Sequence, residues 1–321
     1  MDTVSSKSRP FDDLSERIAG LSPAKRALLE LKLKQAGLGL SQEQIIPRRV
    51  NRDSALWFSA VAIQPNGSKP PFFCVPGNLG NVFTDLDDLA RHLGPDQPFY
   101  GLQDGIQNPS KIEALATHYL DGIRAVQPGG PYLLGGVCSG GAVAFEMARQ
   151  LQAQGQQVAL LALVEPSRPS VSGLPAYFNL LVSFLHRVVQ RSGHHSRNLL
   201  QRSSVELRTY IRLKAKLIAN MWALARYAPQ TYPGRIHLFL ADKALAQSPH
   251  DPRLGWRDLA AGGAEIHIVP GSHDTITRTH DAVPEESHLQ VLAEQLRACI
   301  DDALTDVVAS AGEYQWNDGE L

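Results

Sequence analysis

Cysteine is scarce in this sequence, with three residues among 321. Cys74, Cys138 and Cys299 lie far apart, which excludes a CxxC zinc or redox motif and argues against a disulfide framework. Long hydrophobic runs are also absent, since no apolar stretch reaches the ~18 residues that a membrane span needs. The polar N-terminus lacks the apolar centre of a secretory signal. We therefore expect a protein of the reducing cytoplasm that does not enter a membrane.

A dominant charge of one sign is likewise missing, because the formal net charge is −1. The whole-protein field therefore does not indicate a nucleic-acid partner. Walker, GxGxxG and HExxH motifs are absent as well, so nothing in the sequence points to a nucleotide or a metal. We expect no permanently bound cofactor and no metal site.

Short apolar runs alternate with amphipathic helical patterns from residue 71 onward. Such alternation predicts an α/β fold with a mostly parallel sheet wound on both faces. Helices are predicted over 111–126 and 141–154. The predicted strands lie at 72–75, 98–102, 131–136, 158–164, 235–240 and 264–269.

The alternation breaks once, between the strands at 158–164 and 235–240. The pattern of about seventy residues there predicts helices, and a connection of that length should carry structure and a function of its own. Before the core, residues 13–36 have a helical pattern, with Ser22 as an N-cap and Gly37 as a stop. The sequence predicts an N-terminal helical segment at 1–60 and a first core segment at 61–165. A helical lid follows at 166–232, then a second core segment at 233–303 and an acidic tail at 304–321.

The segment PYLLGGVCSGGAVAFEMARQL predicts a nucleophile elbow, in which a strand turns sharply into a helix. The turn is so tight that the residues two before and two after the nucleophile must be very small. Gly136 and Gly140 meet this requirement for Cys138, whereas Ser139 would have Val137 at the crowded position. The helix N-terminus also favours a thiolate. Cys138 is therefore the predicted nucleophile.

A general base should follow later in the chain, after an orienting carboxylate. Among eleven histidines, His273 follows the last predicted strand by a short Pro-Gly turn, which places it at the sheet edge where the elbow lies. His267 lies within a strand, which favours a packing or surface role. Two carboxylates end strands that can reach His273. We favour Glu165, and Asp242 remains the alternative.

An oxyanion hole requires backbone N–H groups. Ser139 follows the nucleophile and should supply one of them. The glycine-containing loop after the first core strand should supply the second, from Asn78.

The chain from about residue 60 to 303 resembles the thioesterase domains of nonribosomal peptide and polyketide assembly lines. The matching segments include VAIQPNGSKPPFFCVPGNLGN, YLLGGVCSGGAVAFEMARQLQAQGQQVALLALVE and AEIHIVPGSH. The resemblance implies an α/β-hydrolase fold with a helical lid. It also implies an acyl or peptidyl thioester on the phosphopantetheine arm of a carrier protein as substrate. LSPAKRALLELKLKQ resembles segments between assembly-line modules, so the N-terminal helix could dock on a synthetase module.

Two residues depart from the usual pattern of that family, which has serine at the position of Cys138 and aspartate at the position of Glu165. The second departure keeps Asp242 open as the acid. A cysteine exchanges one thioester for another, so acyl transfer is nearly balanced and the acyl-enzyme stays activated. We expect transfer to another carrier thiol slightly before release by hydrolysis or cyclisation. A non-catalytic docking module and a general esterase of the same fold are the alternatives.

Charge is unevenly distributed along the chain. The lid region from Ser167 to Ala241 has eleven Lys and Arg against one acid, Glu206, and the stretch from Asp301 has six acids and no base. A cationic lid would attract acidic carrier proteins. A solvated helix face, with or without the acidic tail folded over it, explains the same pattern.

Overall fold

The structure is a computed structural model of residues 1–321. All of the residues that it describes belong to one compact unit, residues 56–321. The predicted N-terminal helix, most of the predicted lid and the end of the acidic tail lie outside the described residues. The described ranges are 59–77, 86–103, 111–167, 219–220, 222–247, 252–277 and 286–313.

A single sheet of seven strands runs through the described part of the chain, in the order β1-β3-β2-β4-β5-β6-β7. All neighbouring strands pair in parallel except β1 and β3, which are antiparallel. Parallel pairing is expected, because helical crossovers return the chain to the same end of the sheet. The strands are β1 (Ala60–Gln64), β2 (Phe72–Val75), β3 (Phe99–Leu102), β4 (Tyr132–Val137), β5 (Val158–Val164), β6 (Ile236–Ala241) and β7 (Ala264–Val269).

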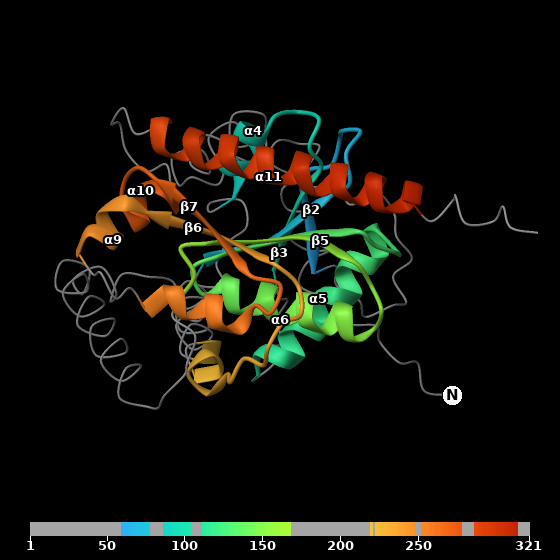
Figure 1. Cartoon of the computed structure of the whole chain (residues 1–321), viewed down its shortest axis with the longest axis horizontal. Coiled ribbons are helices and arrows are strands. Elements are labelled where there is room, and N and C mark those ends of the chain that lie inside the picture. The colour runs from blue at the N-terminus through green and yellow to red at the C-terminus, as the bar shows by residue number, and fades with distance from the viewer. Residues whose placement is uncertain are drawn as a thin grey trace, which may run out of the picture. The chain divides into compact units, whose positions relative to one another are not determined.

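Helices cover both faces of this sheet (Figure 1). One face packs against α5 (Ile112–Val126) and α6 (Gly140–Ala153), and the other packs against α4 (Asp87–Leu93) and α11 (Glu286–Glu313). Central strands buried on both faces should be almost entirely apolar, as the fully buried Phe-Phe-Cys-Val of β2 is. The predicted doubly wound α/β architecture is confirmed.

The six strands predicted from sequence are all present, each within one residue of its predicted bounds. Strand β1 was missed, because it precedes residue 71, where the predicted alternation of strands and helices begins. Four of its five residues pair with β3 at the sheet edge, and several are partly exposed, so the segment lacks a long apolar run. Helix α11 continues to Glu313, so the first part of the predicted acidic tail is helical.

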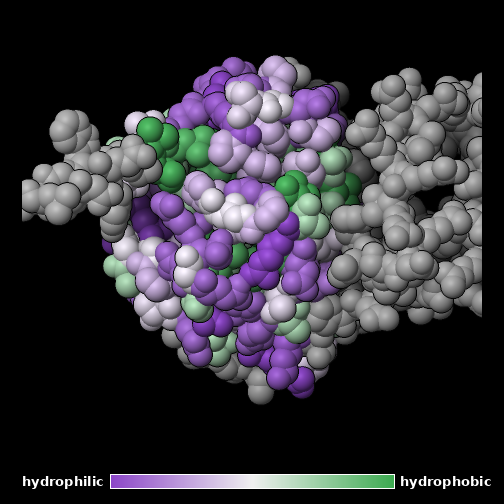
Figure 2. Space-filling view, turned by 90° about the vertical axis from the view of Figure 1, so that its right-hand side faces the viewer, coloured by the Kyte–Doolittle hydropathy of each residue, from purple (hydrophilic) through white to green (hydrophobic). Residues whose placement is uncertain are grey.

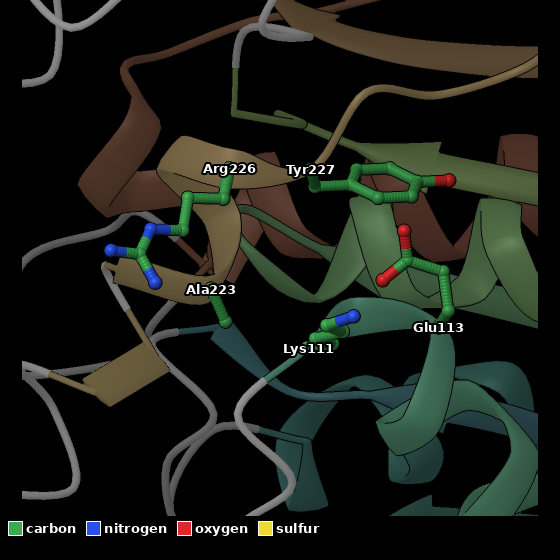
Figure 3. A pocket seen from close by; sticks show the side chains of 5 residues that line it. All are labelled: Lys111, Glu113, Ala223, Arg226 and Tyr227. Atoms are coloured by element: carbon green, nitrogen blue, oxygen red, sulfur yellow. The ribbon is translucent and has the colours of Figure 1, made fainter.

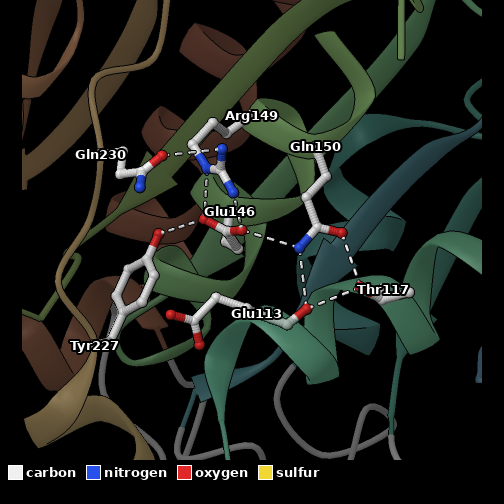
Figure 4. A network of polar contacts seen from close by, with 7 residues as sticks. All are labelled: Glu113, Thr117, Glu146, Arg149, Gln150, Tyr227 and Gln230. Carbon is white, nitrogen blue, oxygen red and sulfur yellow. Dashed lines mark hydrogen bonds and ion pairs between the residues drawn. The ribbon is translucent and has the colours of Figure 1, made fainter. Parts of the chain in front are cut away.

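The end of the predicted lid is anchored to the core by a buried carboxylate. Glu146 on α6 is 1 % exposed, and the Tyr227 hydroxyl donates to its Oε2 at 3.0 Å (Figure 4). Arg149 donates to both Glu146 oxygens, at 2.9 and 2.7 Å. A buried charge needs such partners, because unpaired burial costs several kcal/mol. The last part of the predicted lid is thus held in place where the chain returns to the core.

A shallow pocket lies beside this anchor, between the start of α5 and residues 223–227 (Figure 3). Its lining residues are Lys111, Glu113, Ala223, Arg226 and Tyr227, none of which is a predicted site residue.

Among the described residues on the face drawn in Figure 2, hydrophilic ones predominate and hydrophobic ones form small, separate groups. Within the described ranges, no helix combines the length and apolarity required to cross a bilayer.

Candidate active site

The elbow has the strained geometry that its glycines predict. Cys138 joins β4 to α6 with φ 50°, in the left-handed region that non-glycine residues avoid. A Cβ on Gly136 would lie 2.5 Å from the Gly140 carbonyl oxygen, and one on Gly140 would collide with the carbonyl oxygens of Val75 and Pro76. Glycine is therefore required at both positions. The backbone presents Cys138 at the carboxyl end of the sheet.

Glu165 occupies the corresponding end of the neighbouring strand and is also strained, with φ 44°. Cys138 and Glu165 are the two non-glycine residues with positive φ in the described ranges. Such conformations cost roughly 1–3 kcal/mol each and concentrate at functional sites. Glu165 is 3 % exposed, and its Oε1 accepts a hydrogen bond from the Ala241 backbone N–H at 2.7 Å. This bond orients the carboxylate.

His273 begins the short helix α10 (His273–Thr277), which follows β7 at the same end of the sheet (Figure 1). Its Nδ1 lies 3.2 Å from Glu165 Oε2, and its ring also hydrogen-bonds to the Cys138 thiol. The hydrogen bond with Cys138 has the larger effect and that with Glu165 the next largest, and together they raise the pKa of His273 to about 10. The structure thus brings together Cys138, His273 and Glu165, which lie up to 135 residues apart in sequence.

The Cys138 side chain is partly buried, and its surroundings determine the charge of its thiol. Burial alone would raise the pKa of Cys138, but the hydrogen bond and positive charge of His273 hold it below the ordinary value. Ser167 and the Ser139 backbone N–H add hydrogen bonds that act in the same direction. Hydrogen bonds to a charged form favour that form. The arrangement favours a thiolate beside an imidazolium.

Ser167 is a contact of the nucleophile that was not predicted from the sequence. Its Oγ lies 3.6 Å from Cys138 Sγ, and its backbone N–H donates to the Cys138 carbonyl at 3.0 Å. The buried Trp256 donates from Nε1 to the Ser167 carbonyl at 2.9 Å and so fixes this residue. No motif marks Ser167, and its position two residues after Glu165 was the one available signal.

One of the two predicted oxyanion residues can be located. Ser139 is the N-cap of α6, and its backbone N–H points to the Cys138 sulfur. A donor there is suitably placed for negative charge that develops beside the nucleophile. Asn78 lies outside the described residues. The preceding residue, Gly77, packs near the elbow, since a Cβ there would lie 3.4 Å from Cys138 Cβ.

Asp242, the alternative acid, begins the short helix α9 (Asp242–Gln247). Its Oδ1 accepts a hydrogen bond from the Gly271 backbone N–H at 2.9 Å, and Lys243 N donates to the Gly271 carbonyl at 3.2 Å. Asp242 therefore braces the turn that leads into His273, while Glu165 contacts the His273 ring directly.

The chain matches the thioesterase domain family over residues 70–290, which is more than half of its length. The chain belongs to the thioesterase domain family. The resemblance noted in the sequence is thereby confirmed, and the sheet order and elbow agree with the α/β-hydrolase fold of these domains.

Two relatives of this thioesterase domain are synthetases. It is 30% identical over 282 residues to malpibaldin synthetase of Mortierella alpina, covering 81% of this chain and 5% of the synthetase. It is also 30% identical over 267 residues to CymA of Salinispora arenicola, a probable non-canonical nonribosomal peptide synthetase, covering 74% of this chain and 3% of the relative. The chain therefore spans a small fraction of these relatives.

Among solved structures, this thioesterase domain is similar to the NocB thioesterase domain from the nocardicin cluster. The two share 26% sequence identity with a TM-score of 0.57, covering 76% of this chain and 99% of the other. The similarity therefore extends over a whole thioesterase domain, not over a fragment of one.

Proposed function

We propose that this thioesterase domain acts on acyl, aminoacyl or peptidyl thioesters of carrier proteins through a covalent intermediate on Cys138. The observation that carries the proposal is the hydrogen-bonded chain from the Cys138 thiol through the His273 ring to the buried Glu165 carboxylate. Nucleophile, base and orienting group in this order are the parts that acyl transfer requires. Family membership and the two synthetase relatives support the carrier-bound substrate.

The first half-reaction would load the enzyme. The Cys138 thiolate attacks the carbonyl carbon of the thioester, and the Ser139 N–H stabilises the oxyanion that forms. The intermediate collapses by breaking the bond to the phosphopantetheine sulfur. The imidazolium of His273 donates its proton to that departing sulfur, while Glu165 keeps the ring oriented. The product is an S-acyl Cys138 and a free carrier thiol.

In the second half-reaction, neutral His273 would accept a proton from the incoming nucleophile. A carrier thiol gives transfer, water gives hydrolysis, and a hydroxyl or amine of the acyl chain gives cyclisation. Loading exchanges one thioester for another, so it is close to balanced and reversible. We propose transfer to a second carrier thiol as the favoured outcome. The positive charge of the lid sequence supports an acidic carrier as partner.

Intact-protein mass spectrometry after incubation with an acylated carrier tests the intermediate. The wild-type chain should gain the mass of one acyl group, and peptide mapping should place it on Cys138. A second, unacylated carrier should then acquire the label in a single turnover. If the labelled acyl group leaves solely as free acid or lactone, transfer is ruled out and the assignment as a thioesterase stands. Hydrolysis of small oxygen esters without action on pantetheine thioesters would favour a general esterase instead.

The charge state of the site gives a further prediction. Because the pKa of Cys138 lies below its ordinary value, the midpoint of its alkylation by iodoacetamide should lie at a lower pH than that of an ordinary thiol. The thiolate forms as pH rises through this lowered pKa, and the imidazolium persists until pH rises through the raised pKa of His273, about 10. His273→Gln should move the alkylation midpoint upward, toward that of an ordinary thiol.

The two remaining cysteines provide the background for this measurement. Burial raises the pKa of Cys74 above its ordinary value and that of Cys299 to about 11, so both should react slowly. Cys138→Ala measures their contribution, which is subtracted. An unchanged midpoint in His273→Gln would contradict the ion pair.

A further inference from the structure

Three side chains that can bind a metal meet between the sheet and α11, away from the nucleophile. His237 comes from β6, His267 from the adjacent strand β7, and Cys299 from α11. His237 Nδ1 lies 3.1 Å from His267 Nε2, and Cys299 Sγ lies 3.6 Å from the same His267 atom. All three ligand atoms lie within 4.8 Å of one another.

The two separations from His267 Nε2 match the edges of a tetrahedral zinc site. Zinc binds imidazole nitrogen at about 2.0–2.1 Å and thiolate sulfur at about 2.3 Å. With tetrahedral angles, these bond lengths give about 3.3 Å between two nitrogens and about 3.6 Å between nitrogen and sulfur. The observed 3.1 and 3.6 Å therefore require little side-chain movement to admit an ion.

A fourth ligand is available next to these three side chains. The carboxylate oxygens of Glu265 lie 3.8 Å from His237 Nδ1 and 3.7 Å from His267 Nε2. The side chain of Glu265 is 53 % exposed, so it can turn toward an ion without leaving a buried gap. Two imidazoles, one thiolate and one carboxylate form a ligand set that zinc accepts.

The surroundings hold the imidazoles in a form suited to a cation. The His267 ring stacks on the rings of Phe239 and His237, with centroid separations of 4.5 and 5.3 Å. This stacking fixes the planes of the two imidazoles. A neutral imidazole offers a lone pair on one of its ring nitrogens, so each histidine can supply one ligand atom. Metal binding would require Cys299 to release its thiol proton to solvent, as thiols do when they coordinate zinc.

We propose that His237, His267, Cys299 and Glu265 form a binding site for a zinc-like divalent cation that joins β6, β7 and α11. The site lies toward the opposite end of the strand from the catalytic residues. His237 precedes Ala241, whose N–H holds Glu165, by four residues or about 13 Å of strand. A cation there would stabilise the packing of α11 without entering the reaction.

Hydrogen bonding alone is the competing explanation for the cluster, because one neutral histidine can donate to the other. Titration with Co²⁺ and Zn²⁺ separates the two explanations, since Co²⁺ bound to a thiolate gives a sulfur-to-metal charge-transfer band. The titrations use the full chain carrying Cys138→Ala, which removes the other thiolate able to bind these ions. We expect one ion per chain, the charge-transfer band, and a higher Tm with Zn²⁺.

Substitutions at the cluster test the assignment in that background. Cys299→Ser should abolish the charge-transfer band, and Cys299→Ser or His267→Gln should weaken Zn²⁺ binding at least about 10-fold, because even outer-shell partners contribute that much. Glu265→Gln alters an exposed side chain, so it should weaken binding without lowering the metal-free Tm. Retention of full Zn²⁺ affinity by these three variants, or a Co²⁺ complex of the Cys138→Ala chain without the thiolate band, would overturn the proposal.

Discussion

Replacement of Cys138 by alanine should lower kcat/KM for a carrier-bound thioester by about 10⁴-fold or more, since removing the nucleophile of a catalytic triad has effects of this size or larger. Alanine removes the sulfur that would carry the acyl group and changes little else at the turn. The acyl-enzyme adduct should disappear completely. The measurement combines steady-state thioester cleavage with intact-protein mass spectrometry of the variant.

Cys138→Ser is the informative companion to this variant. Serine preserves a nucleophile of similar size, but it converts the substrate thioester into a more stable oxygen ester. Loading should still occur, whereas transfer from the introduced serine to a second carrier thiol should slow more than hydrolysis does. Cys138→Ala activity within about tenfold of the wild type would show that the thiol is not the nucleophile, because a triad without its nucleophile loses far more.

Glu165→Gln should lower kcat by about 10²- to 10⁴-fold, the range associated with a misoriented or wrongly protonated catalytic base. Glutamine can still accept the Ala241 N–H through its oxygen. Its amide would then face His273 Nδ1 with a donor in place of an acceptor. The ring would be driven to the wrong tautomer or out of position. Steady-state kinetics with a pantetheine thioester measure the loss.

Asp242→Asn provides the matched control, because it makes the same chemical change at the other candidate acid. Asparagine can still accept a hydrogen bond from the Gly271 N–H. The turn before His273 therefore keeps this bond, with a neutral acceptor in place of a charged one. Weakening one such bond is worth about 1 kcal/mol, so the expected loss in kcat is less than tenfold. The opposite ranking, with Asp242→Asn severe and Glu165→Gln mild, would reassign the orienting carboxylate to Asp242. Circular dichroism of both variants checks that each is folded.

The sheet could be predicted because its central strands are buried on both faces. Burial on both faces demands short, continuous apolar runs, and Phe72–Val75 and Val158–Val164 have them. Strand β1 escaped prediction because an edge strand that is partly exposed needs no such run. Its pairing with β3 depends on a partner almost forty residues later in the chain.

The catalytic candidates differ in how far local sequence could identify them. Cys138 is marked by Gly136 and Gly140, since the steric demand of the turn acts within five residues. His273 is marked by its place after the last strand. The choice between Glu165 and Asp242 could not be made locally, because both follow parallel strands that end at the same sheet edge. Ser167 was signalled solely by its position two residues after Glu165, and the His237–His267–Cys299 cluster had no local signal.

The amino-acid sequence by itself determined the fold class, the elbow and the histidine loop, because each depends on periodicity or on steric limits among near neighbours. The tertiary structure alone decided which carboxylate faces His273, that Ser167 touches the thiol, and that two histidines and a cysteine meet beneath α11. Those contacts join residues that are 29 to 108 positions apart. Strand register and helix packing set such distances, and neither is visible in a local pattern.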